Sequence, residues 1–206
     1  MLRADLYEKS IHLEPYVSSG DCRACGFHSR AEFLDNLRAG RLKPAQCKLA
    51  RRRFFQLLWA ARPGDLLPEV EVLQLPNPGP TGLFPINRPE KDSPMLVSGN
   101  SKSTAEVLTA VLSTTLSPFW YLVVDTYGHT VDMAMVYEAL TAQRVVQALH
   151  QEQAEHIAPE STLFLPGLAA PIRDSLAEQS GRPVTVGPVC AAELPLFFGE
   201  THWKVA

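Results

Sequence analysis

The chain has 206 residues, 46% of them hydrophobic and 20% charged, and it contains 4 cysteines. This composition is ordinary for a globular protein and excludes a collagen-like or wholly disordered chain. Residues 2–16 carry too many charges for a secretory signal, and no apolar run approaches the roughly 20 residues that span a bilayer. Cysteines at positions 22, 25, 47 and 190 are too few and too clustered for a secreted disulfide scaffold. We therefore expect a cytoplasmic protein.

Charge and proline divide the chain into two units. Residues 1–63 hold 12 basic and 6 acidic side chains, whereas the rest of the chain holds 7 basic and 16 acidic ones. Eight of the 17 prolines fall between Pro63 and Pro94. Both asymmetries favour two units joined by a stiff connector. We expect a small unit over residues 1–62, a proline-rich linker over residues 63–93 and a larger unit over residues 94–206.

The first unit is expected to be helical. One helix is predicted from Ser29 or Arg30 to Ala39, because Gly40 supplies a C-terminal stop. A second helix, from about Lys48 to Ala61, would present its apolar side chains on one face.

The connector offers little regular structure. Residues 70–73 favour a short strand. Residues 76–82 are rich in proline and glycine, which excludes a helix or a central strand. We expect this stretch to lie extended on the surface of a partner.

The second unit alternates short apolar strands with helices. The expected strands cover residues 95–97, 121–124, 162–165 and 184–186, and the expected helices cover about 103–113, 131–138, 142–153, 170–179 and 191–198. Uniformly apolar strands separated by helices predict an α/β fold with a doubly wound, mostly parallel sheet that is covered on both faces.

Each predicted strand is followed by a loop of small residues. These loops are residues 98–101, 125–128, 166–169 and 187–188. In a parallel α/β sheet they share one edge, and ligands bind at that edge. The alternative is that the glycines and prolines only turn the chain. The sequence has no G-x-G-x-x-G, Walker or G-x-S-x-G motif, so we expect neither a dinucleotide nor a nucleoside triphosphate, and we assign no catalytic residue.

The cysteines of the first unit suggest metal chemistry. Cys22, Cys25 and Cys47 place three soft thiolates within 26 residues, which is typical of iron–sulfur or zinc ligation. Arg30 stands where a fourth ligand is expected, and arginine, which stays charged, does not ligate iron. His28 or a solvent species is the candidate replacement. A [4Fe–4S] cluster, a zinc site and no metal all stay open.

Several short motifs follow one another along the chain, and their order carries more information than any one of them alone. The first is Asp21-Cys22-Arg23-Ala24-Cys25-Gly26 with Cys47 following, and the others are residues 94–100 with Thr104, Tyr121–Gly128, Leu165–Ala169 and Val186–Pro188. Together they resemble the small [4Fe–4S] domain and the C-terminal corrinoid-binding domain of the corrinoid iron–sulfur protein large (gamma) subunit, in the CO dehydrogenase/acetyl-CoA synthase system. Arg30 replaces the third cysteine of that pattern. The chain resembles a short form without the TIM barrel that the family places between these domains.

The resemblance implies a corrinoid-binding protein of one-carbon metabolism. A cobamide would lie over the carboxyl edge of the sheet, where its cobalt accepts and donates a methyl group. The expected partners are a separate TIM-barrel methyltransferase or barrel-bearing subunit and a reductant. By position, the residues expected to hold the cofactor are Gly99, Asn100, Ser101, Thr104, Thr126, Gly128, Pro166, Gly167, Ala169, Gly187 and Pro188, and the expected metal ligands are Cys22, Cys25 and Cys47.

Another class of function stays open beside this one. A non-catalytic interaction or regulatory protein that keeps the fold, but has lost the cluster and the corrinoid, also accounts for Arg30 and for the missing barrel. Neither nucleic acid nor a membrane is expected as a partner. The basic residues 51–53 open a helix without interleaved aromatic side chains, and the larger unit is acidic.

Overall fold

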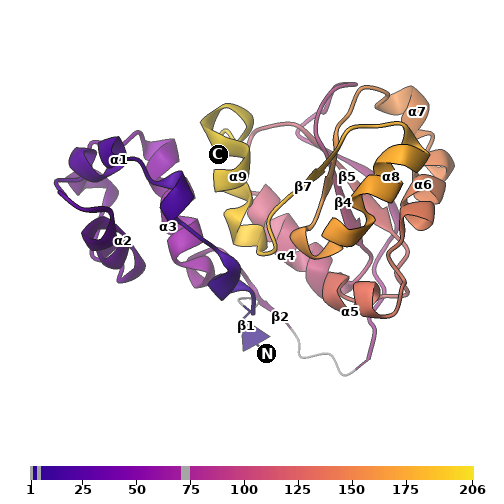
Figure 1. The fold of residues 1–206 in the computed structure, drawn as a ribbon, viewed down its shortest axis with the longest axis horizontal. Helices are drawn as coiled ribbons and strands as arrows, with labels where there is room; N and C mark the ends of the chain where they lie inside the picture. Colours follow the sequence, from indigo (N-terminus) through magenta and orange to yellow (C-terminus); the bar gives the residue numbers. More distant parts are fainter. Residues whose placement is uncertain (1, 4–5, 71–74) are drawn as a thin grey trace.

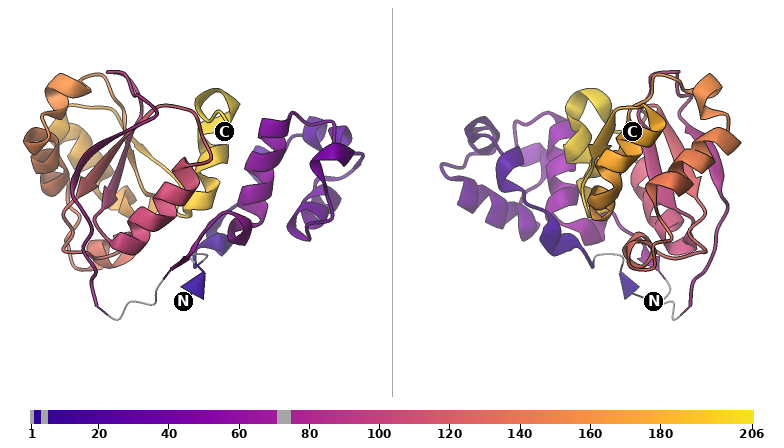
Figure 2. Two further views of the ribbon diagram at one scale, coloured as in Figure 1. Left: turned by 180° about the vertical axis from the view of Figure 1, so that it is seen from behind. Right: turned by 45° about the vertical axis from the view of Figure 1, so that its right-hand side comes forward.

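The computed structural model of this chain describes residues 2–3, 6–70 and 75–206 (Figure 1). A small helical unit precedes a larger α/β unit, and helix α9 lies between the two in every view (Figures 1 and 2). No helix in the described ranges is long and apolar enough to cross a bilayer.

The N-terminal unit contains three α-helices within the described residues, α1 (Ser19–Ala24), α2 (Arg30–Arg38) and α3 (Arg51–Ala61). A two-residue ladder of β1 (Leu2–Arg3) with β2 (Glu69–Val70) joins its two ends in antiparallel fashion. Helix α2 matches the prediction, whereas α3 begins three residues later than Lys48 because Cys47 is still extended. The rest of the predicted strand at residues 70–73 lies outside the described residues.

Helix α1 is held by a capping box that the sequence analysis missed. The Ser18 side chain accepts from the Asp21 backbone N–H at 3.1 Å, and the Asp21 carboxylate accepts from the Ser18 backbone N–H at 2.8 Å. The two bonds satisfy donors that a helix start leaves free, so a helix of only six residues is stable here.

The larger unit is built on a five-stranded mixed sheet in the order β3-β5-β4-β6-β7. Its strands are β3 (Gly82–Ile86), β4 (Met95–Gly99), β5 (Phe119–Val124), β6 (Leu163–Leu165) and β7 (Val184–Val186). Strands β4 to β7 are parallel, and β3 pairs antiparallel with β5. The α/β class and the four predicted parallel strands are confirmed.

Strand β3 lies inside the predicted linker. It contains Pro85, which removes a backbone donor, but β3 is an edge strand where one donor fewer is tolerated. The predicted boundaries of the units, at residues 62/63 and 93/94, stay predictions.

The helices of the larger unit are α4 (Lys102–Leu112), α5 (Val131–Val136), α6 (Ala142–Gln151), α7 (Ala154–Ile157), α8 (Arg173–Ser180) and α9 (Leu194–His202). All five predicted helices are present in outline. Two start later than expected, because short 3-10 turns at Gly167–Ile172 and Ala191–Glu193 precede α8 and α9. In the 3-10 turn Gly167–Ile172, Pro171 lacks the backbone N–H donor that an α-helix starting earlier would need.

The sheet is covered on both faces by separate cores. One core joins Met95, Val97 and Leu122 to side chains of α6 and α8. The other core joins Leu96, Tyr121 and Val123 to α4 and α9, and it continues into the N-terminal unit through Phe33, Leu37 and Leu57. The two units therefore share one apolar core.

Polar contacts reinforce the junction between the units. The Tyr16 hydroxyl donates to Glu193 Oε1 at 2.8 Å, and the side-chain amide of Gln56 donates to the Trp203 carbonyl at 3.3 Å. Trp203 is fully buried and packs on Phe119, in the strand next to the central one.

The proline-rich residues 77–79 cross the carboxyl ends of β4 and β5. The backbone N–H of Asn77 donates to the Gly128 carbonyl at 3.1 Å, and that of Gly79 donates to the Asn100 carbonyl at 2.6 Å. The stretch was predicted to lie extended on a partner surface, and in this structure residues 77–79 lie on the chain's own sheet edge. We call residues 77–79 the strap.

Candidate functional site

The strand order creates a topological switch point at the carboxyl edge of the sheet. From the central strand β4, the chain passes through α4 to β5 on one side, while β6 and β7 lie on the other side. In open α/β sheets, ligands bind in the crevice outside the strand ends at such a point. The fold therefore favours a ligand between the ends of β4 and β6.

A cavity of about 440 Å³ opens at this point. The ends of β4 and β6 form its floor, α4 covers it, and residues 187–191 with α9 form a wall. We call it the switch-point cavity; its lining includes Ser98, Thr104, Val107, Phe164, Pro166 and Leu194. Its volume lies within the range of small-molecule sites, and most of its lining is apolar, which is also typical of them.

Ser98 is the polar exception in the floor of the cavity. Its side chain is 2% exposed, and among the described residues its hydroxyl oxygen has no partner in hydrogen-bond geometry. The Tyr121 hydroxyl is unsatisfied in the same sense. Burial raises the pKa of Tyr121 to about 12, and the nearby Ser98 hydroxyl offsets this only in part. The Ser98 and Tyr121 hydroxyls thus interact with each other, and both oxygens are buried beneath the apolar surface of the floor.

Asp132 and Tyr7 face each other at the mouth of the cavity. Burial raises the pKa of the Tyr7 hydroxyl to about 12, and its hydrogen bond to the Asp132 carboxylate adds to this. Burial alone would raise the pKa of Asp132, but hydrogen bonds from Thr130, from Tyr7 and from the backbone hold it below its ordinary value. Asp132 is therefore a carboxylate at neutral pH. Among the described residues that line the cavity, Asp132 is the one with a charged side chain.

Four of the predicted cofactor residues line the switch-point cavity. They are Thr104, Pro166, Gly187 and Pro188. The other seven, Gly99, Asn100, Ser101, Thr126, Gly128, Gly167 and Ala169, are not among the residues that line it. Gly99 is the last residue of β4, and the other six belong to the segments that follow β4, β5 and β6 at the same sheet edge.

Asn100 organises the loops after β4 and β5. Its side-chain oxygen accepts hydrogen bonds from the backbone N–H groups of Thr126 and Gly128, both at 2.9 Å. Its side-chain amide donates to Asp125 Oδ1 at 3.2 Å and to the Gly79 carbonyl at 3.4 Å. Asn100 is 4% exposed, and Ser101 and Thr126 are fully buried. In this structure the side chains of Asn100 and Thr126 are buried and hold the loops of the sheet edge together by hydrogen bonds.

The glycines of the edge allow close approach of the chain to itself. A Cβ on Gly99 would lie 2.6 Å from Thr126 Oγ1, and one on Gly128 would lie 2.4 Å from the backbone nitrogen of Pro78 in the strap. A Cβ on Gly167 would lie 2.8 Å from the backbone nitrogen of Val189. These glycines are required for packing, whatever else they contact.

Other lining residues were not predicted from the sequence. They include Val107, Asp132 and the N-terminal residues Leu6 and Tyr7. Ser98 belongs to the strand-end loop 98–101 that the sequence predicts at the ligand-binding edge. No local pattern relates Leu6 and Tyr7 to a sheet edge about ninety residues away in sequence.

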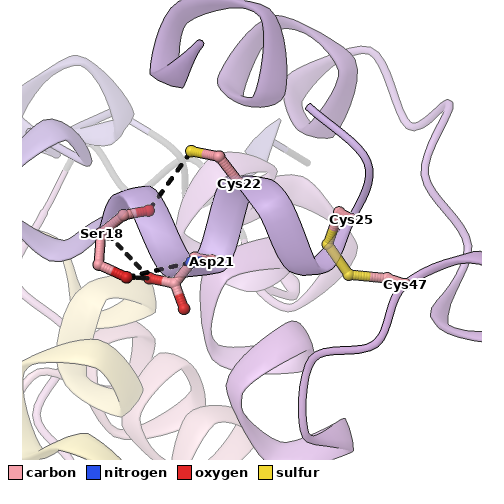
Figure 3. Close-up of a disulfide and its surroundings, with 5 residues drawn as sticks. All are labelled: Ser18, Asp21, Cys22, Cys25 and Cys47. Atoms are coloured by element: carbon pink, nitrogen blue, oxygen red, sulfur yellow. Dashed lines mark hydrogen bonds between the residues drawn. A yellow bond between two sulfur atoms is a disulfide. The ribbon is translucent and has the colours of Figure 1, made fainter. Parts of the chain in front are cut away.

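The predicted metal ligands do not form one set. Cys25 and Cys47 are joined in a disulfide. The Cys22 thiol points away from that bridge and donates to the Ser18 carbonyl at 3.4 Å (Figure 3). In the part of the chain that the structure describes, no three His, Cys, Asp or Glu side chains lie close enough to hold a metal ion.

A [4Fe–4S] cluster does not fit this arrangement. Such a cluster is held by four cysteine thiolates. Two of the three sulfurs here are bonded to each other, the third is directed elsewhere, and Arg30 and His28 are both exposed. We therefore assign no role to a cluster in this form of the chain.

Comparison with known proteins identifies the family. Residues 73–198 match the model of the CO dehydrogenase/acetyl-CoA synthase delta subunit family. This match spans most of the α/β unit. The chain belongs to this family.

Relatives carry names from the same system. The acetyl-CoA decarbonylase/synthase complex subunit gamma 2 of Methanosarcina thermophila is 29% identical over 156 residues, which cover 71% of this chain and 33% of the relative. Subunit gamma of Methanopyrus kandleri is 29% identical over 116 residues, covering 56% of this chain and 25% of the relative. The matches thus cover about a quarter to a third of these relatives' length. The resemblance to the gamma subunit is confirmed.

Proposed function

We propose that this chain is a corrinoid-binding protein that acts as a methyl carrier, or as a corrinoid redox partner, for a separate methyltransferase. The observation that carries the proposal is the switch-point cavity, which is mostly apolar and lies where a doubly wound sheet binds ligands. Membership of the family, with the corrinoid chemistry that the sequence motifs imply, supports the choice of ligand.

The size of the cavity limits how a cobamide would sit. A volume of about 440 Å³ is that of a pocket for a drug-sized molecule, and a cobamide is much larger. We propose that the tail of the cobamide enters between α4 and the floor while the corrin ring stays outside, over the loops of the sheet edge. When bound, the cobalt would supply the acceptor and the donor of the methyl group. Thr104 would orient the tail.

The proposal is tested by adding hydroxocobalamin to the purified chain and measuring cobalt and the visible spectrum after gel filtration. The wild-type chain should retain about one cobalt per chain. Val107→Trp, which fills the cavity from α4, should lower retention at least tenfold. Val146→Trp on α6 is the matched control, because Val146 is also half-buried but packs on the opposite face of the sheet. Absence of retained cobalt in the wild-type chain would refute the proposal.

Partner subunits form part of this proposal. The relatives are named as subunits of a complex. Val136 at the end of α5 and Tyr137 directly after it are 71% and 61% exposed, and Tyr127, in the loop after β5, is 57% exposed. Exposed apolar side chains in one place mark interaction surfaces. We propose that a barrel-bearing subunit covers this side of the edge, in the cytoplasm, and that Val136→Lys would weaken its binding in gel filtration of the mixed subunits.

A second candidate is an interaction or regulatory protein without a cofactor. The observation that favours it is the disulfide between two of the three cysteines of the cluster motif. This candidate predicts neither iron nor cobalt in anaerobically prepared protein, together with a tight complex with the partner. Stoichiometric corrinoid in such a preparation would exclude it.

A further inference from the structure

Three residues of the N-terminal unit reach the switch-point cavity. Leu6, Tyr7 and Val70 all line it, although they lie far in sequence from the sheet edge. Leu6 is 76% exposed, so most of its side chain has no protein neighbour to cover it. Tyr7 is half-buried, and its hydroxyl is bonded to Asp132 beside the N-terminus of α5. The N-terminal unit thus extends across the mouth.

The position of this unit is fixed by several independent contacts. Its core is continuous with that of the sheet, through Leu57 on one side and Phe198 and Trp203 on the other. The bonds Tyr16–Glu193 and Gln56–Trp203 lie within the junction, and α9 packs directly against α3. Tyr7–Asp132 adds a contact at the cavity itself. A unit held in this way does not move freely relative to the cavity.

The cysteines tie two segments of the N-terminal unit together. A cluster needs thiolates gathered around it, whereas here the sulfurs of Cys25 and Cys47 are bonded to each other. The disulfide ties the end of α1 to the segment before α3, and the backbone N–H of Lys48 donates to the Ala24 carbonyl at 2.7 Å beside it. This part of the unit is built as a rigid support.

We propose that the N-terminal unit is a fixed wall of the switch-point cavity, and that Leu6 and Tyr7 contact the ligand bound there. The inference rests on the proposed function for the identity of the ligand, but not for the existence of the wall. A ligand that enters the cavity passes the exposed Leu6 side chain and the Tyr7 ring. Apolar contact with Leu6 would be gained on binding, because Leu6 has little protein contact beforehand.

The test compares two leucines of equal exposure in the full-length chain. Leu6→Asp places a charge in the wall, whereas Leu75→Asp places one at a position that is 77% exposed and outside the cavity lining. Dissociation constants are measured by titration with hydroxocobalamin and, separately, with the neutral apolar dye Nile red. Leu6→Asp should weaken binding of both probes about tenfold, because the bound probe would press an apolar group against the new charge and remove water from it. Leu75→Asp should change binding less than twofold.

The outcomes separate this inference from the proposed function. If the wild-type chain binds Nile red but not hydroxocobalamin, the proposed function fails. The effect of Leu6→Asp on Nile red binding then tests by itself whether the N-terminal unit forms a wall of the cavity. Binding of both probes by Leu6→Asp within twofold of the wild type would overturn the inference, and so would failure of the wild type to bind either probe. Should circular dichroism show that Leu6→Asp is misfolded, Leu6→Ala replaces it, with an expected loss of about threefold.

Discussion

The Asp21 carboxylate joins a helix start to a neighbouring helix. It accepts from the Ser18 backbone in the capping box of α1, and Arg53 on α3 donates to it at 3.2 Å. The same Arg53 guanidinium donates to the Tyr16 carbonyl. Burial raises the pKa of Asp21, but the hydrogen bonds from Arg53 and Ser18 outweigh burial and hold it below its ordinary value. The ionised form therefore stabilises the native state.

Asp21→Asn should lower the free energy of unfolding by about 1–3 kcal/mol at pH 7, because hydrogen bonds to a charged group are lost. Since the pKa of Asp21 is lowered on folding, its contribution is complete above the unfolded value of about 3.9 and is lost as pH falls through the folded value. The difference in unfolding free energy between wild type and variant, measured by urea unfolding, should thus narrow as the pH falls below about 4. Asp174→Asn is the control, because Asp174 is paired with Arg173 on the surface; an equal loss there, or a gap that does not depend on pH, would contradict the argument.

Gly128 carries the closest approach between the strap and the sheet edge. Its φ is +78°, a conformation that costs other residues about 1–2 kcal/mol, and a Cβ would also meet the strap backbone. Gly181 has a similar φ of +65° with nothing within 4 Å of a Cβ. Gly181→Ala should therefore lose about 1–2 kcal/mol and Gly128→Ala about 2–4 kcal/mol, the difference being the clash with Pro78. Urea midpoints measure both; equal losses would mean that the strap does not lie on Gly128 in solution.

At the scale of elements, a disulfide links the end of α1 to the segment before α3. Cys25 and Cys47 are separated by 22 residues, and closing a loop of this size stabilises a fold by about 3 kcal/mol. Dithiothreitol should lower the urea midpoint of the wild-type chain correspondingly, while a Cys25→Ser, Cys47→Ser double variant should not respond. A thiol titration in denaturant should find two of the four cysteines reactive before reduction. Stoichiometric iron and inorganic sulfide in an anaerobic preparation would contradict this.

The elements show which parts of this fold were readable from sequence. The strands β4 and β5 were predicted because both faces of the sheet are covered, which leaves an uninterrupted apolar run such as Met95–Val97. Strand β3 was missed because Pro85 argues against a strand unless the strand is known to lie at an edge. Edge position depends on pairing with β5, more than thirty residues further along the chain. Local pattern carries no information about it.

The site was readable only to the level of the sheet edge. The small residues at the strand ends were expected to meet a ligand, and Pro166 and Gly187 do line the cavity. Gly99 and Gly128 instead accommodate other parts of the chain, which the sequence does not distinguish from a ligand. Asn100 was predicted to contact the cofactor. Its hydrogen bonds to the strap and to the loop after β5 join segments that are far apart in sequence, so only the tertiary structure shows them.

At the scale of the whole molecule, the shared core predicts that the two units unfold together. Leu37 and Leu57 of the N-terminal unit belong to the same apolar cluster as Tyr121 and Trp203. Two units whose interface continues a hydrophobic core behave as one cooperative body, whereas units joined by a linker alone open separately. Amide hydrogen exchange at increasing urea distinguishes these cases, because it reports the opening free energy of each element.

Amides of α3 and of β5 should therefore approach the same opening free energy in the wild-type chain. Tyr16→Phe, which removes the bond to Glu193 across the junction, should lower the opening free energy of both elements by about 1 kcal/mol. Tyr137→Phe is the matched control, because Tyr137 is 61% exposed and directly follows α5, away from the junction, and it should leave both values unchanged. Two outcomes would show that the N-terminal unit is an independent body: exchange of α3 amides at a much lower urea concentration than β5 amides, or a Tyr16→Phe effect confined to α3. The proposed wall of the cavity would then be in place only part of the time.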